Sequence, residues 1–256
     1  MQDEKRPGTG LIVRSFVFNV WIYAFLFVVS VGFLPILLGP RRWALIPART
    51  WIHGVVWGLR YIVGARVEVR GLEHRPVGPA IVASKHQGMF DIMEPFLALD
   101  GPCFVLKREL SKIPVFGLYC TRLRMIPVDR GGGSTAVKAL VRESQERIDE
   151  GLQVLIFPEG TRRPPGAPPA YKIGVAALYR DLDMPVTPMA TNSGQCWPAN
   201  GFLRYPGLVV FEFLPPIPPG MKRANFMTAL QEAIEPASTA LLALNPHRPQ
   251  SFDPGE

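Results

Sequence analysis

The sequence predicts an α/β domain in which helices flank a mostly parallel central sheet, preceded by an N-terminal membrane-associated helical segment. After residue 64, short apolar stretches alternate with amphipathic ones, the pattern of strands joined by helical crossovers. Before it, the 26 residues from Ser15 to Pro40 contain no charged side chain. That run exceeds the roughly 20 residues that a helix needs to span a bilayer.

Strands are expected wherever a short run is rich in β-branched and other apolar residues. In the first of them Val67 and Val69 alternate with charged residues, so one face of that strand is expected to be half exposed. The second carries no charge and is expected to be buried. The expected strands are 65–70, 79–84, 103–106, 125–128, 153–157, 185–190 and 208–214.

Helices are expected between these strands, with Ser134 capping one of them and Pro236 interrupting the last. Their expected ranges are 88–99, 115–123, 134–150, 171–182 and from Arg223 onward. The tail from Asn245 is expected to be disordered. The chain is thus divided into an anchoring segment at 1–64, a globular domain at 65–244 and a flexible tail at 245–256.

The uncharged run has two interpretations, and both place the protein on a membrane. Gly39 and Pro40 end the run, Arg41 and Arg42 follow, and a second apolar stretch at helical spacing begins near Ala48. The run is either one spanning helix followed by an ordinary core helix, or one arm of a helical hairpin that enters a single leaflet. A signal peptide is disfavoured, because the run is too long and no small-x-small cleavage site follows.

Composition narrows the class of partner. The net charge of +7 favours anionic partners, and the 48% hydrophobic content with no nucleic-acid-binding module favours membrane lipids over nucleic acid. Three cysteines without C-x-x-C spacing argue against a disulfide framework and a zinc site, and fit a reducing compartment. The sequence has no GxSxG, P-loop, HExxH or GxGxxG motif, which disfavours serine hydrolases, NTPases, zinc proteases and dinucleotide-dependent oxidoreductases.

Charged or titratable side chains follow four of the expected strands. In open α/β sheets, ligands bind beyond the carboxyl ends of the strands, so these side chains are expected to line one site. They are His86 after 79–84, Lys107 after 103–106, Arg130 after 125–128, and Glu159 with Arg162 after 153–157.

His86 and Asp91 stand five residues apart in the segment 85–91. Positions five apart on a regular helix are separated by roughly 140°, so the two side chains can touch only if His86 precedes the helix. Gly88 allows the chain to turn there. Asp91 would then hold one imidazole nitrogen and leave the other as a base that can deprotonate an alcohol.

The segment 157–162 places the carboxylate of Glu159 and the guanidinium of Arg162 on a loop bounded by Pro and Gly. A carboxylate accepts a hydrogen bond from a hydroxyl group, and a guanidinium matches the oxygens of a phosphate. Arg130 precedes three glycines and a helix start. Those glycines either offer backbone N–H groups to an anion or form a flexible hinge.

Taken together, these segments resemble the bacterial 1-acylglycerol-3-phosphate acyltransferases, the lysophosphatidic acid acyltransferase family, over roughly residues 66–222. The resemblance lies in the segments 85–91, 126–130, 157–162 and 184–188. Two departures are visible: Lys85 stands where Asn is common, and residues 88–90 replace a more usual Ser-Trp-X.

The resemblance implies a role for each candidate residue. His86 would remove the proton from the sn-2 hydroxyl of 1-acylglycerol-3-phosphate, and Asp91 would orient His86. Phosphate binding would fall to Lys107, Arg130 and Arg162, and placement of the glycerol to Glu159, Gly160 and Thr161.

The remaining expectations also follow from the resemblance. The acyl donor would be acyl-CoA or acyl-carrier protein, the product phosphatidic acid, and the enzyme would sit on the inner membrane with its catalytic domain facing the cytoplasm. No metal or cofactor is expected, because a thioester is already activated. The alternatives are an acyltransferase for another lysolipid, such as a lyso-ornithine lipid, and a non-catalytic protein that binds anionic lipids.

Overall fold

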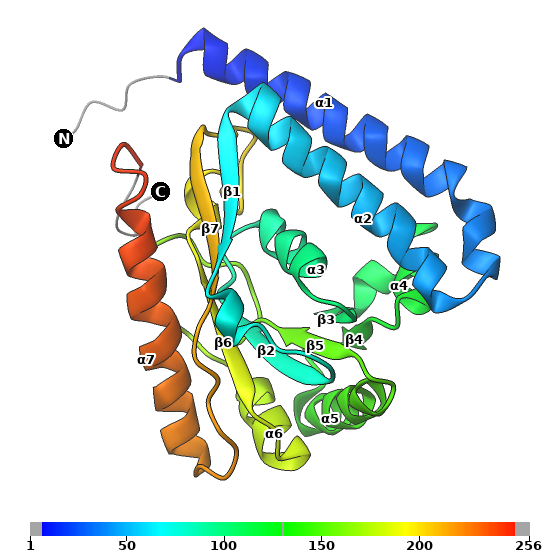
Figure 1. Cartoon of the computed structure of the whole chain (residues 1–256), viewed down its shortest axis with the longest axis vertical. Coiled ribbons are helices and arrows are strands. Elements are labelled where there is room, and N and C mark those ends of the chain that lie inside the picture. Colours follow the sequence, from blue (N-terminus) through cyan, green and yellow to red (C-terminus); the bar gives the residue numbers. More distant parts are fainter. Residues whose placement is uncertain (1–6, 130, 249–256) are drawn as a thin grey trace.

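The computed structural model describes residues 7–129 and 131–248, which form a seven-stranded sheet with helices on both faces (Figure 1). The strand order is β1-β7-β6-β2-β5-β3-β4, and every neighbouring pair is parallel except β6 with β7. The mostly parallel α/β fold is therefore confirmed. The strands are β1 (Ala65–Arg70), β2 (Ala80–Ser84), β3 (Pro102–Lys107), β4 (Ile126–Val128), β5 (Gln153–Ile156), β6 (Val186–Thr191) and β7 (Gly207–Phe213).

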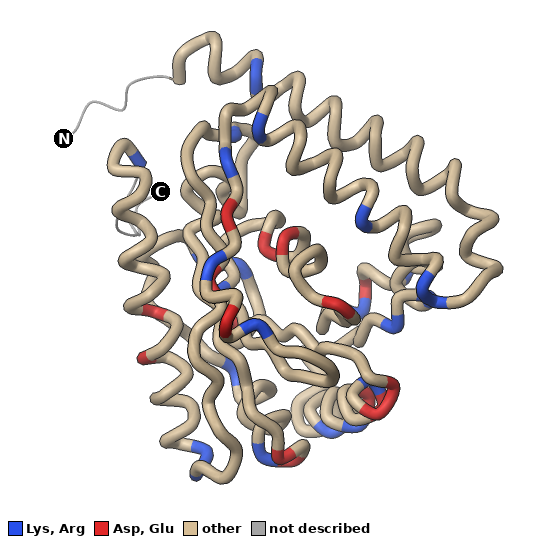
Figure 2. Tube along the Cα trace, in the orientation of Figure 1, with Lys and Arg blue, Asp and Glu red and all other residues tan. Residues whose placement is uncertain are grey.

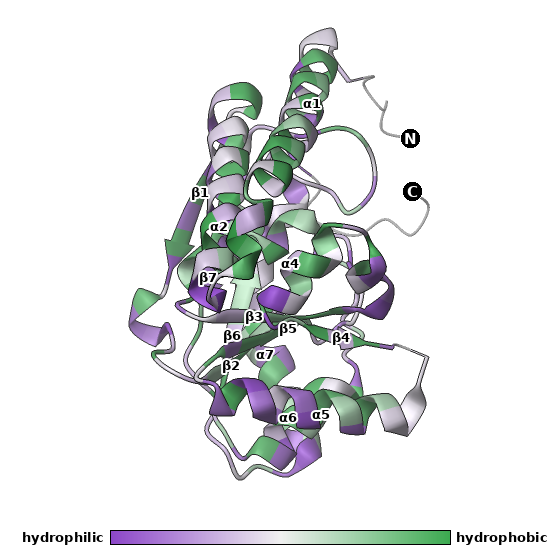
Figure 3. Ribbon diagram, turned by 90° about the vertical axis from the view of Figure 1, so that its right-hand side faces the viewer, coloured by the Kyte–Doolittle hydropathy of each residue, from purple (hydrophilic) through white to green (hydrophobic). Residues whose placement is uncertain are grey.

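The helices divide between the two faces of the sheet (Figures 1 and 3). One face carries α5 (Gly133–Asp149), α6 (Ile173–Leu182) and α7 (Arg223–Leu242); the other carries α1 (Thr9–Gly32), α2 (Arg41–Gly58), α3 (Glu94–Ala98) and α4 (Phe116–Arg122). Short helical turns complete the chain: η1 (Leu34–Leu38), η2 (Leu59–Val63), η3 (Leu72–His74), η4 (Met89–Ile92), η5 (Arg108–Lys112) and η6 (Ser193–Gln195).

The central strands are buried on both faces, as their near-continuous apolar sequences require. Successive side chains of β2 point to opposite sides. Val82 joins the core beneath α1, α2 and α3, whereas Ile81 and Ala83 join the core beneath α5, α6 and α7. Since β6, β2, β5, β3 and β4 are mutually parallel, their carboxyl ends share one edge of the sheet.

Helices α1 and α2 form an antiparallel hairpin that packs on the domain (Figure 1). The indole N–H of Trp21 donates to the carbonyl of Gly54 at 3.0 Å, and that of Trp51 donates to the carbonyl of Ile22 at 3.2 Å. Among the described helices, α1 is the one with the length and composition to cross a membrane. Its outward side remains exposed and apolar.

The second helix of this hairpin begins at Arg41, so the expected start near Ala48 is wrong. Arg41, the first residue of α2, accounts for the longer helix, and Arg49 attaches the expected part of the helix to the domain. Arg41 donates to the carbonyl of Pro102 at 3.2 Å, and Arg49 to that of Leu99 at 3.1 Å. These contacts hold α2 against the domain. They join residues that are distant in the sequence, so the spacing of apolar residues does not predict them.

Three further sequence expectations are corrected. The expected helix 88–99 is split into η4 and α3, because Pro95 lies in the first turn of α3 and cannot continue a preceding helix. Helix α5 begins at Gly133 with no side-chain cap, so Ser134 is not its cap. Helix α7 runs through Pro236, which is exposed, so the carbonyl that loses its partner can bond to water.

The fold also extends further toward the C-terminus than expected. Asn245 is buried, and its amide bonds both the N–H and the carbonyl of Leu208 in β7. The expectation of disorder is therefore wrong at Asn245, and most of the expected tail, 249–256, lies outside the described residues.

Candidate active site

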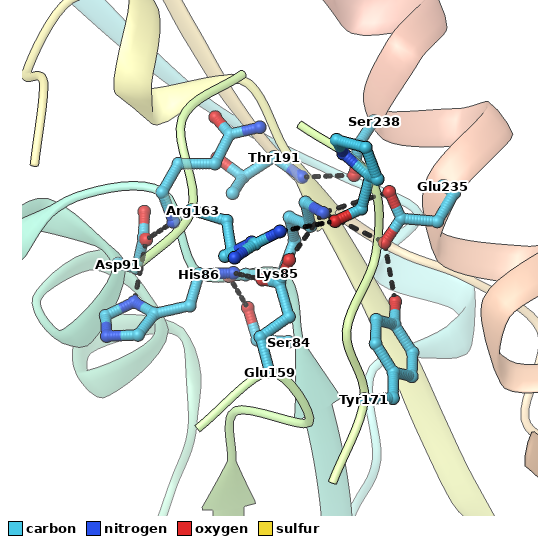
Figure 4. Close-up of polar contacts among 12 residues, drawn as sticks. Ser84, Lys85, His86, Asp91, Glu159, Arg163, Tyr171, Thr191, Glu235 and Ser238 are labelled. Carbon is cyan, nitrogen blue, oxygen red and sulfur yellow. Dashed lines mark hydrogen bonds and ion pairs between the residues drawn. The ribbon is translucent and has the colours of Figure 1, made fainter. Parts of the chain in front are cut away.

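His86 lies two residues beyond the end of β2, in the middle of the parallel edge of the sheet. Its Nδ1 is 3.0 Å from Oδ2 of Asp91 (Figure 4). Its ring stacks on Phe157, the first residue after β5, with the ring centroids 3.9 Å apart. Because a carboxylate oxygen can only accept, Nδ1 carries the hydrogen and the lone pair is on Nε2.

The carboxylate of Asp91 is fully buried and held by several donors at once. Its Oδ2 also accepts the backbone N–H groups of Gln87 at 2.5 Å and Gly88 at 2.7 Å, and its Oδ1 accepts the hydroxyl of Ser193. Hydrogen bonds to the charged form compensate the cost of burying a carboxylate. The carboxylate is thus fixed in position and cannot rotate away from His86.

Local backbone geometry brings the His86 and Asp91 side chains together, as the sequence spacing required. His86 precedes the helical turn η4, and Gly88 is extended, with φ of −151° and ψ of −179°. A Cβ atom at Gly88 would lie 2.4 Å from the carbonyl oxygen of Trp197. Only glycine fits this close approach, so the turn that allows the contact depends on the absence of a side chain.

Glu159, two residues after Phe157, holds the backbone of His86. Its Oε2 accepts the His86 N–H at 3.0 Å, and its Oε1 accepts Nζ of Lys85 at 2.8 Å (Figure 4). Its side chain is fully buried. Burial raises the pKa of Glu159, while the Lys85 ammonium opposes that shift. Both oxygens are therefore engaged by the protein, in contrast to the expected contact with a glycerol hydroxyl.

The chain after Glu159 turns back along the His86 loop. Gly160 adopts a φ of +65°, and Thr161 and Arg162 are exposed beside it. The N–H of Arg163 donates to the carbonyl of His86 at 2.8 Å. The backbone of His86 is consequently held on both sides, by Glu159 at its N–H and by Arg163 at its carbonyl.

Two of the three expected phosphate ligands, Lys107 and Arg162, follow strands that end at the same edge of the sheet. Lys107 is the last residue of β3, and its side chain is half exposed. Its Nζ lies 3.7 Å from Oε1 of Glu109. Strand β5 separates β3 from β2, so two strand spacings place Lys107 roughly 10 Å from the His86 strand. Arg162 follows β5, and Arg130 lies outside the described residues. Lys107 and Arg162 thus share an edge with His86 without contacting it.

Sequence reasoning did not find the contribution of the segment after β6. Ser193 donates to Asp91, and the N–H of Gly194 donates to the side-chain oxygen of Gln87 at 3.0 Å. A signal was available, because β6 ends at Thr191 on the same edge as β2. The expected site residues were charged or titratable residues that follow four of the strands. A search for polar residues after the sixth strand would have found Ser193.

Comparisons with known proteins identify a family that the chain resembles. The family model described as Acyltransferase matches residues 66–192. A 1-acyl-sn-glycerol-3-phosphate acyltransferase of Pseudomonas aeruginosa is 36% identical over 205 residues, which are 79% of this chain and 79% of that protein. The 1-acyl-sn-glycerol-3-phosphate acyltransferase alpha of Homo sapiens is 32% identical over 163 residues, 62% of this chain and 58% of that protein.

A solved structure supports the fold. The crystal structure of the 1-acyl-sn-glycerophosphate acyltransferase PlsC from Thermotoga maritima matches with a TM-score of 0.74 at 20% sequence identity. The match covers 90% of this chain and 97% of that one.

Proposed function

The chain belongs to the 1-acyl-sn-glycerol-3-phosphate acyltransferase family, and from this membership we propose that it acylates the sn-2 hydroxyl of 1-acylglycerol-3-phosphate. The product is phosphatidic acid. One observation carries the proposal beyond the family name: Nδ1 of His86 lies 3.0 Å from a buried, fully bonded Asp91 at the carboxyl edge of the sheet.

In the proposed reaction His86 is the general base. Its Nε2 removes the proton of the sn-2 hydroxyl while that oxygen attacks the thioester carbonyl, and Asp91 stabilises the imidazolium that forms. When the tetrahedral intermediate collapses, the C–S bond breaks and His86 returns the proton to the departing thiolate. A base held in one tautomer and one orientation is the requirement of this step, and the Asp91 contacts support it.

The phosphate of the acceptor is assigned to basic residues on the same edge. Arg162 and Lys107 are exposed there, and Arg130, in the same stretch of sequence as the end of β4, is proposed to join them. Guanidinium groups match phosphate oxygens in a bidentate geometry. Gly160 and Thr161 are proposed to contact the glycerol, and Glu159, whose carboxylate is occupied, to hold the His86 backbone rather than the substrate.

The donor is proposed to be acyl-CoA or acyl-carrier protein. Either thioester is activated enough for direct attack, so the proposed mechanism uses no metal and no cofactor. The lipid product and acceptor place the reaction at a membrane, and we propose the inner membrane with the catalytic domain on its cytoplasmic side.

Helix α1 is proposed to lie in one leaflet rather than to cross the bilayer. Within α1 the sequence contains one basic residue, Arg14, and no acidic residue, and the trace of the helix is almost entirely tan in Figure 2. Protein contacts hold both ends of this helix against the domain: Ser15 bonds the N–H of Arg204, and the Tyr119 hydroxyl bonds the carbonyl of Ser30 at 3.1 Å. A helix attached along its length cannot stand upright in a bilayer without the domain, which favours the interfacial hairpin.

Paired acceptors test the proposed function. Purified full-length protein in vesicles is offered 1-acylglycerol-3-phosphate, monoacylglycerol or a lyso-ornithine lipid, each with acyl-CoA and with acyl-carrier protein thioester. We expect phosphatidic acid from the first acceptor with at least one thioester, and poor use of the second.

Two other outcomes would replace the proposal. Preferential acylation of the lyso-ornithine lipid would keep the mechanism and change the acceptor. Binding of anionic lipid without consumption of either thioester would make the protein a lipid-binding module.

A further inference from the structure

A buried ammonium group connects the C-terminal helix to the loop that carries His86. Lys85 is 2% exposed, and its Nζ contacts Oε1 of Glu159 at 2.8 Å and both carboxylate oxygens of Glu235 at 2.9 Å (Figure 4). Glu235 lies in α7, 150 residues from Lys85 in the sequence. The hydroxyl of Tyr171 donates to Glu235 at 2.8 Å and holds it from the other side.

These contacts form a continuous series that ends at the catalytic base. Glu235 accepts from Lys85, and Lys85 donates to one oxygen of Glu159. The other oxygen of Glu159 accepts the His86 N–H at 3.0 Å. The series reaches the backbone of His86, whereas Asp91 acts on its ring. Two independent sets of contacts therefore determine where the imidazole lies.

We propose that Lys85 and Glu235 are positioning residues for His86, through which helix α7 sets the turnover of the enzyme. This inference rests on the proposed acyltransferase function. In this proposal neither residue contacts the substrate. Their part is to keep the Glu159 carboxylate where it fixes the His86 backbone, which requires the ammonium between the two carboxylates.

The charges of this cluster explain why the ammonium cannot simply be removed. Two carboxylates, Glu159 and Glu235, share one cation, and the Glu159 side chain has no exposed surface. A buried carboxylate without its partner is costly, so it takes up a proton or moves toward water. Either response changes the acceptor that the His86 N–H faces, and small displacements of a catalytic group reduce the rate strongly.

Glu235, the member of the cluster on α7, is partly exposed and borders a cavity, so it can be replaced by a smaller residue. A cavity of about 180 Å³ is lined by Lys85, Gln87 and Glu235 together with Ser238 and Thr239. The Glu235 side chain is 22% exposed, so shortening it enlarges an existing cavity instead of opening a void in the apolar core. Glu232 and Thr239 are exposed on the same helix and provide matched controls.

The first experiment compares Glu235→Ala and Glu235→Gln with Glu232→Gln and Thr239→Ala, in full-length protein with 1-acylglycerol-3-phosphate and acyl-CoA. We expect Glu235→Ala to lower kcat about 10- to 100-fold with little change in KM, because orientation of the base is lost and substrate binding is not. Glu235→Gln retains an oxygen that accepts from Lys85 and Tyr171, so it should recover most of the loss. Both controls should match the wild type.

The second experiment uses Lys85→Met alone and combined with Glu235→Gln. Lys85→Met leaves two buried carboxylates without a cation and should lower kcat more than Glu235→Ala does. Adding Glu235→Gln removes one of those charges, so the double variant should be at least as active as Lys85→Met. Residues that act independently would instead multiply their losses.

Several results would overturn the inference while the wild type makes phosphatidic acid. They are wild-type kcat in Glu235→Ala, equal losses in Glu235→Ala and Glu235→Gln, or multiplicative losses in the double variant. If Lys85→Met does not fold, the two Glu235 variants and their controls decide alone. Absence of phosphatidic acid from the wild type would refute the proposed function instead.

Discussion

On helix α1, the residues Phe16, Phe27 and Val28 are 58%, 69% and 63% exposed. In the loops around His86, by contrast, Asp91 and Glu159 are at most 1% exposed. The two regions thus depart from the usual distribution of side chains in opposite directions. Apolar groups are exposed where the protein is proposed to meet lipid, and charged groups are buried where it is proposed to do chemistry.

A different energetic cost accounts for the arrangement of side chains in each region. An exposed apolar stripe on a soluble surface marks a contact with another apolar phase. In the described part of the chain, the outward side of α1 keeps large apolar side chains exposed. A buried carboxylate is tolerated only when donors surround it, and Asp91 has donors on both oxygens. Substitutions in the two regions should therefore affect different measurements.

On the buried side, Asp91→Asn should produce an effect second only to the loss of His86 itself. The amide would still fill the space, but it carries no negative charge to stabilise the imidazolium that forms on His86. An NH₂ group in place of Oδ2 would face the N–H donors that now bond the carboxylate. We expect kcat to fall on the order of 10²-fold or more, measured as phosphatidic acid formation. Unchanged membrane binding is the control, and wild-type kcat would remove Asp91 from the mechanism.

Arg162→Ala should separate phosphate binding from the chemistry. Hydrogen bonds to a charged group are worth about 1.5–3 kcal/mol, so the apparent KM for 1-acylglycerol-3-phosphate should rise about ten- to hundredfold. If the contact strengthens in the transition state, kcat falls as well. With monoacylglycerol, which has no phosphate, the variant should match the wild type. Equal losses on both acceptors would assign Arg162 to the fold or to the thioester.

Phe27→Asp should affect the exposed side alone. Burial of a large apolar side chain in lipid contributes about 1.5–3 kcal/mol, so vesicle binding should weaken about tenfold or more. Val77→Asp is the matched control, because Val77 is 87% exposed in a loop far from α1 in the sequence. Equal vesicle binding by both variants would mean that α1 does not insert.

Glu94→Gln should give the smallest effect, and it contrasts with Asp91. Burial raises the pKa of Glu94 from 4.5 to about 7, and its Oε2 has no hydrogen-bond partner in the described part of the chain. The unfolded chain loses this proton near pH 4.5 and the folded protein near pH 7. The contribution of Glu94 to stability is therefore present below pH 4.5 and is lost as the pH rises toward 7.

Glutamine at position 94 cannot ionise, so the variant should melt a few degrees higher than the wild type at pH 8. At pH 4.5 the melting temperatures should coincide. Equal differences at both pH values would mean that packing, and not ionisation, accounts for the change.

The sequence predicted the local features of this molecule well and the distant contacts poorly. The strands were predicted to within one residue at each end, because each is a short run that contains β-branched or other apolar residues. The contact between His86 and Asp91 was predicted from five residues of local sequence. Ser193 and Glu235 were not found, because they lie 102 and 150 residues from the side chains they bond. The position of Ser193 after the sixth strand was a signal that could have been used, but no local pattern indicates that Glu235 bonds Lys85.

Errors at helix ends have the same origin. Arg41 extends α2 by contacts with a carbonyl 61 residues away, which no pattern of apolar spacing indicates. The buried position of Glu159 was also not visible, because its partner Lys85 looks like a surface charge in the sequence. Residue type and position after a strand predicted which groups follow strands at this edge, and only the fold determined that Glu159 is buried whereas Arg162 is exposed.

The most direct measurement is kcat of purified His86→Ala for phosphatidic acid formation, with vesicle binding determined on the same preparation. The account predicts that kcat falls on the order of 10²–10⁴-fold, the usual contribution of a general base, while vesicle binding equals that of the wild type. Wild-type kcat in His86→Ala would contradict the mechanism. A parallel loss of vesicle binding would contradict the separation between the buried site and the exposed helix.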